Sequence, residues 1–116
     1  MVIKVLKSPI KIAELSAIAR EGFGDMVKAA VDIKQGIMAV GGEFHADEEA
    51  LLMGQHRSER EFVWGVNLYP KKSGEEFIKF DSMINLKPAQ GNRTRGVEDV
   101  AIQEKIEAVV QRLISE

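Results

Sequence analysis

Residues 61–86, EFVWGVNLYPKKSGEEFIKFDSMINL, decide the fold. They contain two apolar runs, 61–70 and 76–86, separated by the polar sequence KKSGE. Side chains alternate between the two faces of a strand, and a short polar connection containing glycine joins neighbouring antiparallel strands. The segment therefore predicts two adjacent antiparallel strands.

The register between these strands determines which face is buried. If Tyr69 lies opposite Phe77, one face is almost wholly apolar and is expected to face the core. Its members are Phe62, Trp64, Val66, Leu68, Ile78, Phe80, Ser82, Ile84 and Leu86. The other face is mixed, which is typical of a solvated face, a partly covered layer or the floor of a ligand site. Its members are Val63, Gly65, Asn67, Tyr69, Phe77, Lys79, Asp81, Met83 and Asn85.

The N-terminal third predicts a strand, two helices and a hairpin. Residues 2–6 have the composition of a strand, and Ser8 with Pro9 is a favourable helix start for a pattern that ends near Gly22. Residues 23–32 resemble a second, short helix. Residues 31–42 place a glycine-containing turn between two apolar runs, which predicts a hairpin.

Two further helices are expected. Residues 45–54, HADEEALLMG, put acidic side chains at a helix start, with His45 or Asp47 as the cap and Gly54 at the exit. The C-terminal stretch has an apolar stripe at helical spacing and Asp99 as its cap. The whole chain, 1–116, therefore predicts one α+β domain. We expect a largely antiparallel sheet of about five strands, with three or four helices packed on one side.

The composition excludes several classes of protein. The 116 residues contain no cysteine, so disulfides, thiol nucleophiles and cysteine-ligated metals are excluded. A formal net charge of −2 argues against nucleic acid as the partner. No apolar run is long enough to cross a membrane, and the N-terminal stretch is interrupted by lysines and a proline. We therefore expect a cytoplasmic protein with no membrane partner, and no sequence fingerprint indicates a cofactor.

The loop 87–96 is the first candidate site. Arg93 and Arg95 present planar donors suited to a carboxylate or phosphate, and Asn92 adds another donor. The loop leads into the N-terminus of the last helix, where anions are favoured. The alternative is that the arginines pair with local acids, such as Asp81 or Glu98, and hold a long loop in place.

The mixed strand face is the second candidate site. In the assumed register it carries Asn67, Asp81 and Asn85, with Asp81 as a possible base and the two asparagines as orienting groups. An ordinary solvated face explains the same residues, and a slip of one residue would turn these side chains into the core.

His45 lies between Glu43 and Asp47, which suggests a divalent cation or acid–base chemistry, and hence a metal-dependent hydrolase as a third hypothesis. Helix capping and charges that favour the helix dipole explain these residues with fewer assumptions. We therefore assign no metal ligands. His45 remains, with Asp81, a candidate for proton transfer.

Several unbroken stretches resemble a family of short prokaryotic proteins of unknown function, domain-of-unknown-function family 5674. They are FGDMVKAAVDIKQGIMAVGGEFHADEEALL, WGVNLYP and FDSMINLKPAQGNRTRGVED. The resemblance covers nearly the whole chain and implies a single-domain cytoplasmic protein, without any reaction or catalytic residue to transfer.

Two functional hypotheses follow from the residues. The first is binding of a small anionic ligand by the 87–96 loop, with or without catalysis. The second is a homodimer or protein-interaction module that uses the mixed face, where Val63, Tyr69, Phe77 and Met83 supply apolar surface.

Overall fold

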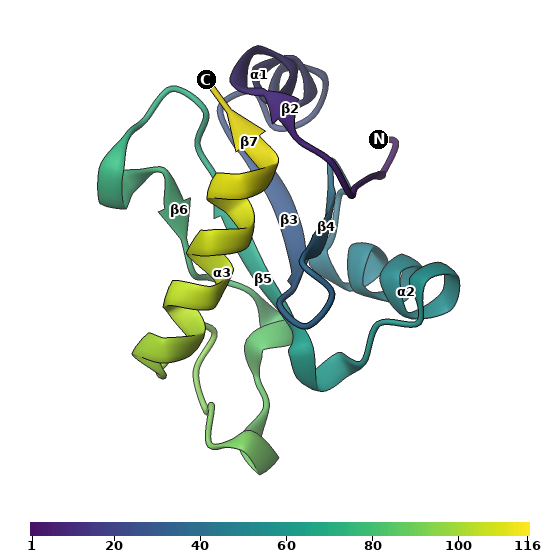
Figure 1. Cartoon of the computed structure of the whole chain (residues 1–116), viewed down its shortest axis with the longest axis vertical. Coiled ribbons are helices and arrows are strands. Elements are labelled where there is room, and N and C mark those ends of the chain that lie inside the picture. Colours follow the sequence, from purple (N-terminus) through teal and green to yellow (C-terminus); the bar gives the residue numbers. More distant parts are fainter.

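The computed structural model describes all 116 residues and consists of a five-stranded antiparallel sheet with three helices (Figure 1). The strand order is β1-β4-β3-β5-β6. The strands are β1 (Lys4–Leu6), β3 (Val27–Asp32), β4 (Ile37–Val40), β5 (Val63–Leu68) and β6 (Ile78–Lys79). The helices are α1 (Ile12–Glu21), α2 (His45–His56) and α3 (Val100–Leu113). The predicted α+β fold is confirmed.

A second, very small sheet ties the chain ends together. β2 (Ile10–Lys11) pairs in parallel with β7 (Ile114–Ser115), directly before α1 and directly after α3. Short 3-10 turns at 60–62, 74–76, 83–85 and 88–90 complete the chain. No helix has the length and apolar character needed to span a membrane.

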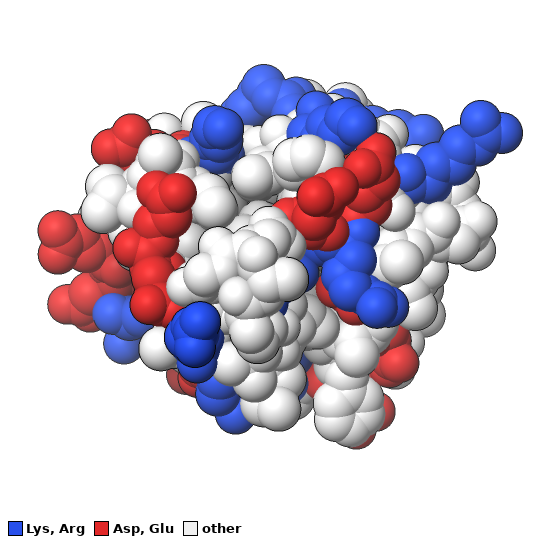
Figure 2. Space-filling view, turned by 90° about the horizontal axis from the view of Figure 1, so that it is seen from below, with Lys and Arg blue, Asp and Glu red and all other residues white.

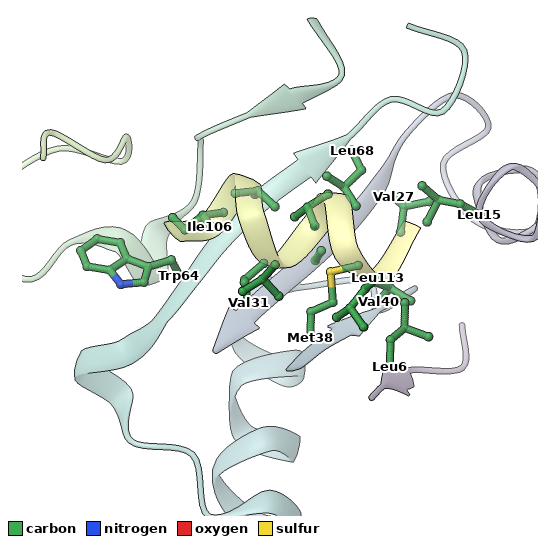
Figure 3. Close-up of a cluster of buried hydrophobic side chains, with 14 of the residues drawn as sticks. Leu6, Leu15, Val27, Val31, Met38, Val40, Trp64, Leu68, Ile106 and Leu113 are labelled. Carbon is green, nitrogen blue, oxygen red and sulfur yellow. The ribbon is translucent and has the colours of Figure 1, made fainter. Parts of the chain in front are cut away.

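The main core lies between the sheet and the helices α1 and α3 (Figure 3). It comprises 17 buried residues, and α3 crosses the sheet face above β3 and β4. The largest of its fully buried side chains are Trp64, Leu15, Met38, Leu68, Ile106 and Leu113. Ile106, Val110 and Leu113 belong to the predicted stripe of the last helix, which is confirmed.

Helix α2 covers the opposite face of the sheet, so the expectation that all helices pack on one side is wrong. Leu52 of α2 packs against Ala30, Ile37, Ala39 and Val63 in a second cluster. The small side chains Ala30 and Ala39 on this face let the helix approach closely. Both faces of β3 and β4 are therefore buried.

The predicted hairpin register is confirmed, but the second strand is much shorter than expected. The Tyr69 N–H donates to the carbonyl oxygen of Phe77, and Leu68 lies opposite Ile78. Trp64, Val66 and Leu68 face the main core as predicted.

After Lys79 the chain leaves the sheet and crosses to the α2 side. The expected placement of Ser82 and Ile84 on the main core face is therefore wrong. Ile84 packs with the second cluster, and Ser82 lies over Gly65, where a Cβ would come within 2.5 Å of its side chain. The absence of a side chain at Gly65 makes this crossing possible.

Residues 23–32 are not a helix, because Val27–Asp32 is the central strand β3. A central strand buried on both faces has a continuous apolar run, which periodicity does not distinguish from a buried helix. The first helix begins at Ile12 instead of near Ser8, since β2 intervenes.

The helix caps were predicted with mixed success. Asp99 caps α3, where its side chain accepts a hydrogen bond from the Ala101 N–H, as predicted. Neither His45 nor Asp47 caps α2, because Phe44 holds the N-cap position and no side chain caps this end. Gly54 lies inside α2, which ends at His56 and is followed by the C-cap residue Arg57, with a left-handed φ of 57°.

Candidate functional site

A row of polar residues crosses three strands on the α2 side of the sheet. Lys28 of β3 lies opposite Asn67 of β5, and Asn67 lies opposite Lys79 of β6. Side chains at directly opposite positions share a face and lie about 5 Å apart at Cβ. The row lies at the end of the sheet where α2 begins, because β4 leads through residues 41–44 into that helix. We call these three residues the Lys28 row.

Asn67 is the central member of the row, and its Oδ1 atom is buried without a hydrogen-bond partner. A buried amide oxygen without a donor costs free energy, and such groups in folded proteins are usually satisfied. The oxygen therefore has an unused acceptor position, which an incoming O–H or N–H group fills once the side chains that cover it move aside.

His45 lies beside the row, at the first position of α2. Its side chain packs against Gly65, and its Nε2 atom lies 2.8 Å from the carbonyl oxygen of Val66. Burial lowers the pKa of His45, with smaller effects from Lys28 and Arg95, which lower it, and from Val66 and Asp81, which raise it. The ring is thus neutral near pH 7, with Nε2–H donating to Val66 and Nδ1 left as an acceptor.

The first turn of α2 adds donors to the same region. The amides of Asp47 and Glu48 bond to the carbonyl oxygen of Phe44, whereas those of His45 and Ala46 have no partner in the protein. Free N–H groups at the start of a helix attract negative charge. They add to the positive potential of Lys28 and Lys79.

The 87–96 loop, by contrast, uses its polar groups internally. Asn92 is 5% exposed, and its amide nitrogen donates to the carbonyl oxygens of Asn85, Thr94 and Gly96. Its Oδ1 accepts from the Glu98 N–H at 2.8 Å. This one side chain holds the two ends of the loop together.

Asn85 is fully buried, and its side chain bonds to the part of β5 that β6 is too short to pair with. Its Oδ1 accepts from the Gly65 N–H at 2.8 Å, and its Nδ2 donates to the carbonyl oxygens of Gly65 and Arg95. An amide side chain thus replaces the backbone of a missing strand. Asn85 and Asn92, both predicted to bind ligand, direct their side chains into the protein.

Lys87 anchors the loop to the rest of the domain. Its Nζ donates to the carbonyl oxygen of Arg60 and lies 5.2 Å from the centre of the Trp64 ring. Burial lowers the pKa of Lys87, and Glu49 nearby opposes that shift. The loop is therefore held by a buried cation as well as by asparagines.

The two arginines of the loop differ in their surroundings. Arg95 Nε lies 2.7 Å from Asp81 Oδ1 in an ion pair whose side chains are 56% and 57% exposed. The Arg93 side chain is exposed and forms no ion pair, although its backbone N–H donates to Glu98 at 2.5 Å. The charges of Asp81 and Arg95 act on the pKa of His45, which indicates that this pair lies near the ring, whereas Arg93 has no such effect.

We expect the Arg95–Asp81 pair to contribute about 0.2–1 kcal/mol to stability, because both groups are largely in water. A double-mutant cycle with Arg95→Ala and Asp81→Ala, measured by urea unfolding, gives this coupling energy. A coupling well above 1 kcal/mol, persisting in high salt, would show that the pair is a structural clasp.

The remaining hypotheses find less support. The structure brings together no group of three or more His, Asp or Glu side chains that could hold a metal ion. Of the apolar residues proposed for an interface, Val63 is buried under α2 and Phe77 packs on the main core, whereas Tyr69 is half-buried and Met83 is exposed. Basic and acidic side chains are interspersed around an uncharged centre on the face seen from below (Figure 2).

A wide groove of about 1400 Å³ lies between α3 and the β5–β6 hairpin. Its floor is apolar, with Phe77, Phe80 and Ile114 half-buried there, and its rim carries Lys72, Glu75 and Glu107. The groove carries both signs of charge, and no polar side chain in it is left buried without a partner.

Sequence reasoning named Asn67 and His45 as candidate site residues and placed Lys79 on the mixed face without a role, but it missed Lys28. Residues 23–32 were assigned to a helix, which places Lys28 away from the mixed face. Once Val27–Asp32 is a strand, pairing with β5 puts Lys28 directly beside Asn67. The alternation of Lys28 with Val27 and Ala29 was the signal available in the sequence.

The family comparison agrees with the resemblance in the sequence. A family model described as protein of unknown function (DUF5674) matches residues 4–113. No curated protein and no solved structure matches the chain.

Proposed function

Because the chain belongs to the DUF5674 family of proteins of unknown function, we propose its function from the geometry: it binds a small anionic ligand at the Lys28 row. This differs from the 87–96 loop expected from the sequence. That loop borders the proposed site through Arg95, while Asn92 of the loop and Asn85 just before it stabilise the fold.

One observation carries the proposal: a buried, unpartnered oxygen belongs to Asn67 of β5, and a lysine lies opposite Asn67 on each of the two strands that flank β5. Lys28 and Lys79 lie two strand spacings, about 10 Å, apart with Asn67 between them, so an anion placed over Asn67 is attracted by both ammonium groups. The unpartnered oxygen adds a requirement for a hydrogen-bond donor. The preferred ligand therefore carries an O–H or N–H group next to its negative charge.

Phosphate and its monoesters meet both requirements. Near neutral pH, part of the population of a monoester retains a P–O–H group that can donate to Asn67, while the charged oxygens face the lysines. A carboxylate with a neighbouring hydroxyl or amino group has the same pattern of donors and acceptors. In either case the neutral His45 ring offers Nδ1 as a second acceptor.

We expect Lys28→Gln to weaken phosphate binding at least about fivefold, because it removes a half-buried positive charge from the site. The measurement is a titration of labelled protein with inorganic phosphate, followed by two-dimensional NMR at constant ionic strength. Saturable shifts should centre on the amides of residues 28, 45, 46, 67 and 79.

Lys105→Gln is the matched control, because Lys105 is an exposed lysine on α3, which packs on the opposite face of the sheet. It should leave the phosphate affinity unchanged. Equal weakening by both substitutions would indicate only a general effect of charge. Shifts confined to residues 87–96, and lost in Arg93→Ala, would instead place the site in the arginine loop.

A further inference from the structure

We infer that the ligand of the Lys28 row carries a flat aromatic ring next to its anionic group. This inference rests on the proposed function and defines its ligand class more narrowly. The evidence is a pair of exposed phenylalanine rings that flank the ammonium group of Lys28.

The two rings come from separate parts of the chain. The Lys28 Nζ lies 5.2 Å from the centre of the Phe23 ring and 5.7 Å from that of the Phe44 ring. Phe23 follows α1, whereas Phe44 directly precedes α2. Tertiary folding thus brings two rings and one cation together at the same end of the sheet.

These rings are unusual for their exposure. Phe23 is 41% exposed and Phe44 is 56% exposed, and they are the only aromatic residues among seven exposed large hydrophobic ones. Trp64 is buried, and Phe62, Tyr69, Phe77 and Phe80 are half-buried. The two most exposed rings of the protein therefore border the same lysine.

The position of Phe44 adds to this argument. It is the N-cap residue of α2, a position where serine, threonine, aspartate and asparagine are preferred because their side chains bond to the first turn. Phenylalanine provides no such bond, and its ring is left largely in water. Capping does not explain this residue, and its contact with Lys28 leaves most of the ring in water, where it is free to stack on a ligand ring.

The shape of the surface indicates how such a ring would lie. The hollow beside Phe23 and Lys28 has a volume of only about 10 Å³, enough for about one water molecule. A ligand ring therefore stacks on the outer surface of Phe44 or Phe23 and is not enclosed. Its anionic group then reaches Lys28 and Asn67.

The test compares three phosphate monoesters of the same charge: methyl, cyclohexyl and phenyl phosphate. We expect phenyl phosphate to bind at least about fivefold more tightly than methyl phosphate, with cyclohexyl phosphate between them. Phe44→Leu should remove the preference for phenyl over cyclohexyl phosphate. Phe62→Leu is the matched control, because Phe62 also lies beside a lysine, Lys34, at 5.2 Å, and it should leave the preference intact.

The outcomes separate this inference from the proposed function. Methyl and phenyl phosphate binding equally well, both weakened by Lys28→Gln, would overturn the inference and leave anion binding standing. Failure of all three esters and of inorganic phosphate to bind would overturn both. If Phe44→Leu does not fold, judged by its NMR spectrum, Phe23→Leu serves for the same comparison.

Discussion

Replacing Asn85 with alanine is expected to lower the free energy of unfolding by about 3–5 kcal/mol, a large part of the stability of a domain of this size. The side chain makes three hydrogen bonds: two buried ones to the backbone of Gly65 and a partly buried one to the carbonyl oxygen of Arg95. Alanine leaves the N–H and C=O groups of Gly65 without partners inside the protein. Each unsatisfied buried group costs about 1–3 kcal/mol.

The effect should be measured by chemical denaturation of the folded variant. Asn67→Ala is the matched control, because Asn67 is also an asparagine on this side of the sheet, but its Oδ1 has no partner to lose. We expect that control to change stability by less than about 1 kcal/mol. Similar losses in the two variants would show that Asn85 does not complete the sheet edge.

The second large effect concerns Glu48, a fully buried carboxyl group in the first half of α2. Burial raises its pKa to about 9, against the opposing hydrogen bond from the Gly42 N–H and the charge of Lys28. Its other oxygen, Oε1, has no partner. The folded protein therefore holds this carboxyl group protonated at neutral pH, whereas the unfolded chain ionises it.

The direction of the pH effect follows from this difference. Below about pH 4.5 the group is protonated in both states and does not change stability with pH. As the pH rises from about 4.5 to about 9, only the unfolded chain loses the proton, so the folded state becomes progressively less favoured. Above about pH 9 the carboxyl group is ionised in both states, and stability no longer changes with pH through this group.

We therefore expect Glu48→Gln to be more stable than the wild type at pH 7, by up to about 3 kcal/mol. Glutamine keeps the shape and the acceptor for Gly42 but never ionises. The stability difference between the two proteins should grow steadily between about pH 5 and pH 8 in denaturation experiments.

Glu104→Gln is the matched control, since Glu104 is an exposed glutamate of α3. It should show a small difference that does not grow with pH. A Glu48→Gln protein whose advantage is the same at every pH would mean that Glu48 is ionised in the folded state. That result would place a bound cation or a nearby lysine against Oε1.

Local patterns determined much of the fold. The alternation in 61–70 and the KKSGE turn placed Trp64, Val66 and Leu68 on the core face, because a strand places every second side chain on the same face. The Asp99 cap and the apolar stripe defined α3, because both depend on neighbouring turns of one helix. These elements needed no information from distant residues.

The candidate site was predicted only in part. His45, Asn67 and Lys79 were already assigned to this region or to the mixed face, whereas Lys28 was placed in a helix that does not exist. The error arose because β3 is buried on both faces, and its continuous apolar run resembles a buried helix. Recognising that strand requires its partners β4 and β5, which lie elsewhere in the sequence.

Only the tertiary structure decided what the asparagines do. The sequence showed a polar loop with amide side chains, which suits a ligand site and a buried network equally well. The choice depends on the backbone groups of Gly65, which β6 is too short to reach and which Asn85 satisfies from 20 residues away. A hydrogen bond across such a separation has no local pattern, because it exists only after the sheet has formed and its edge has been left open.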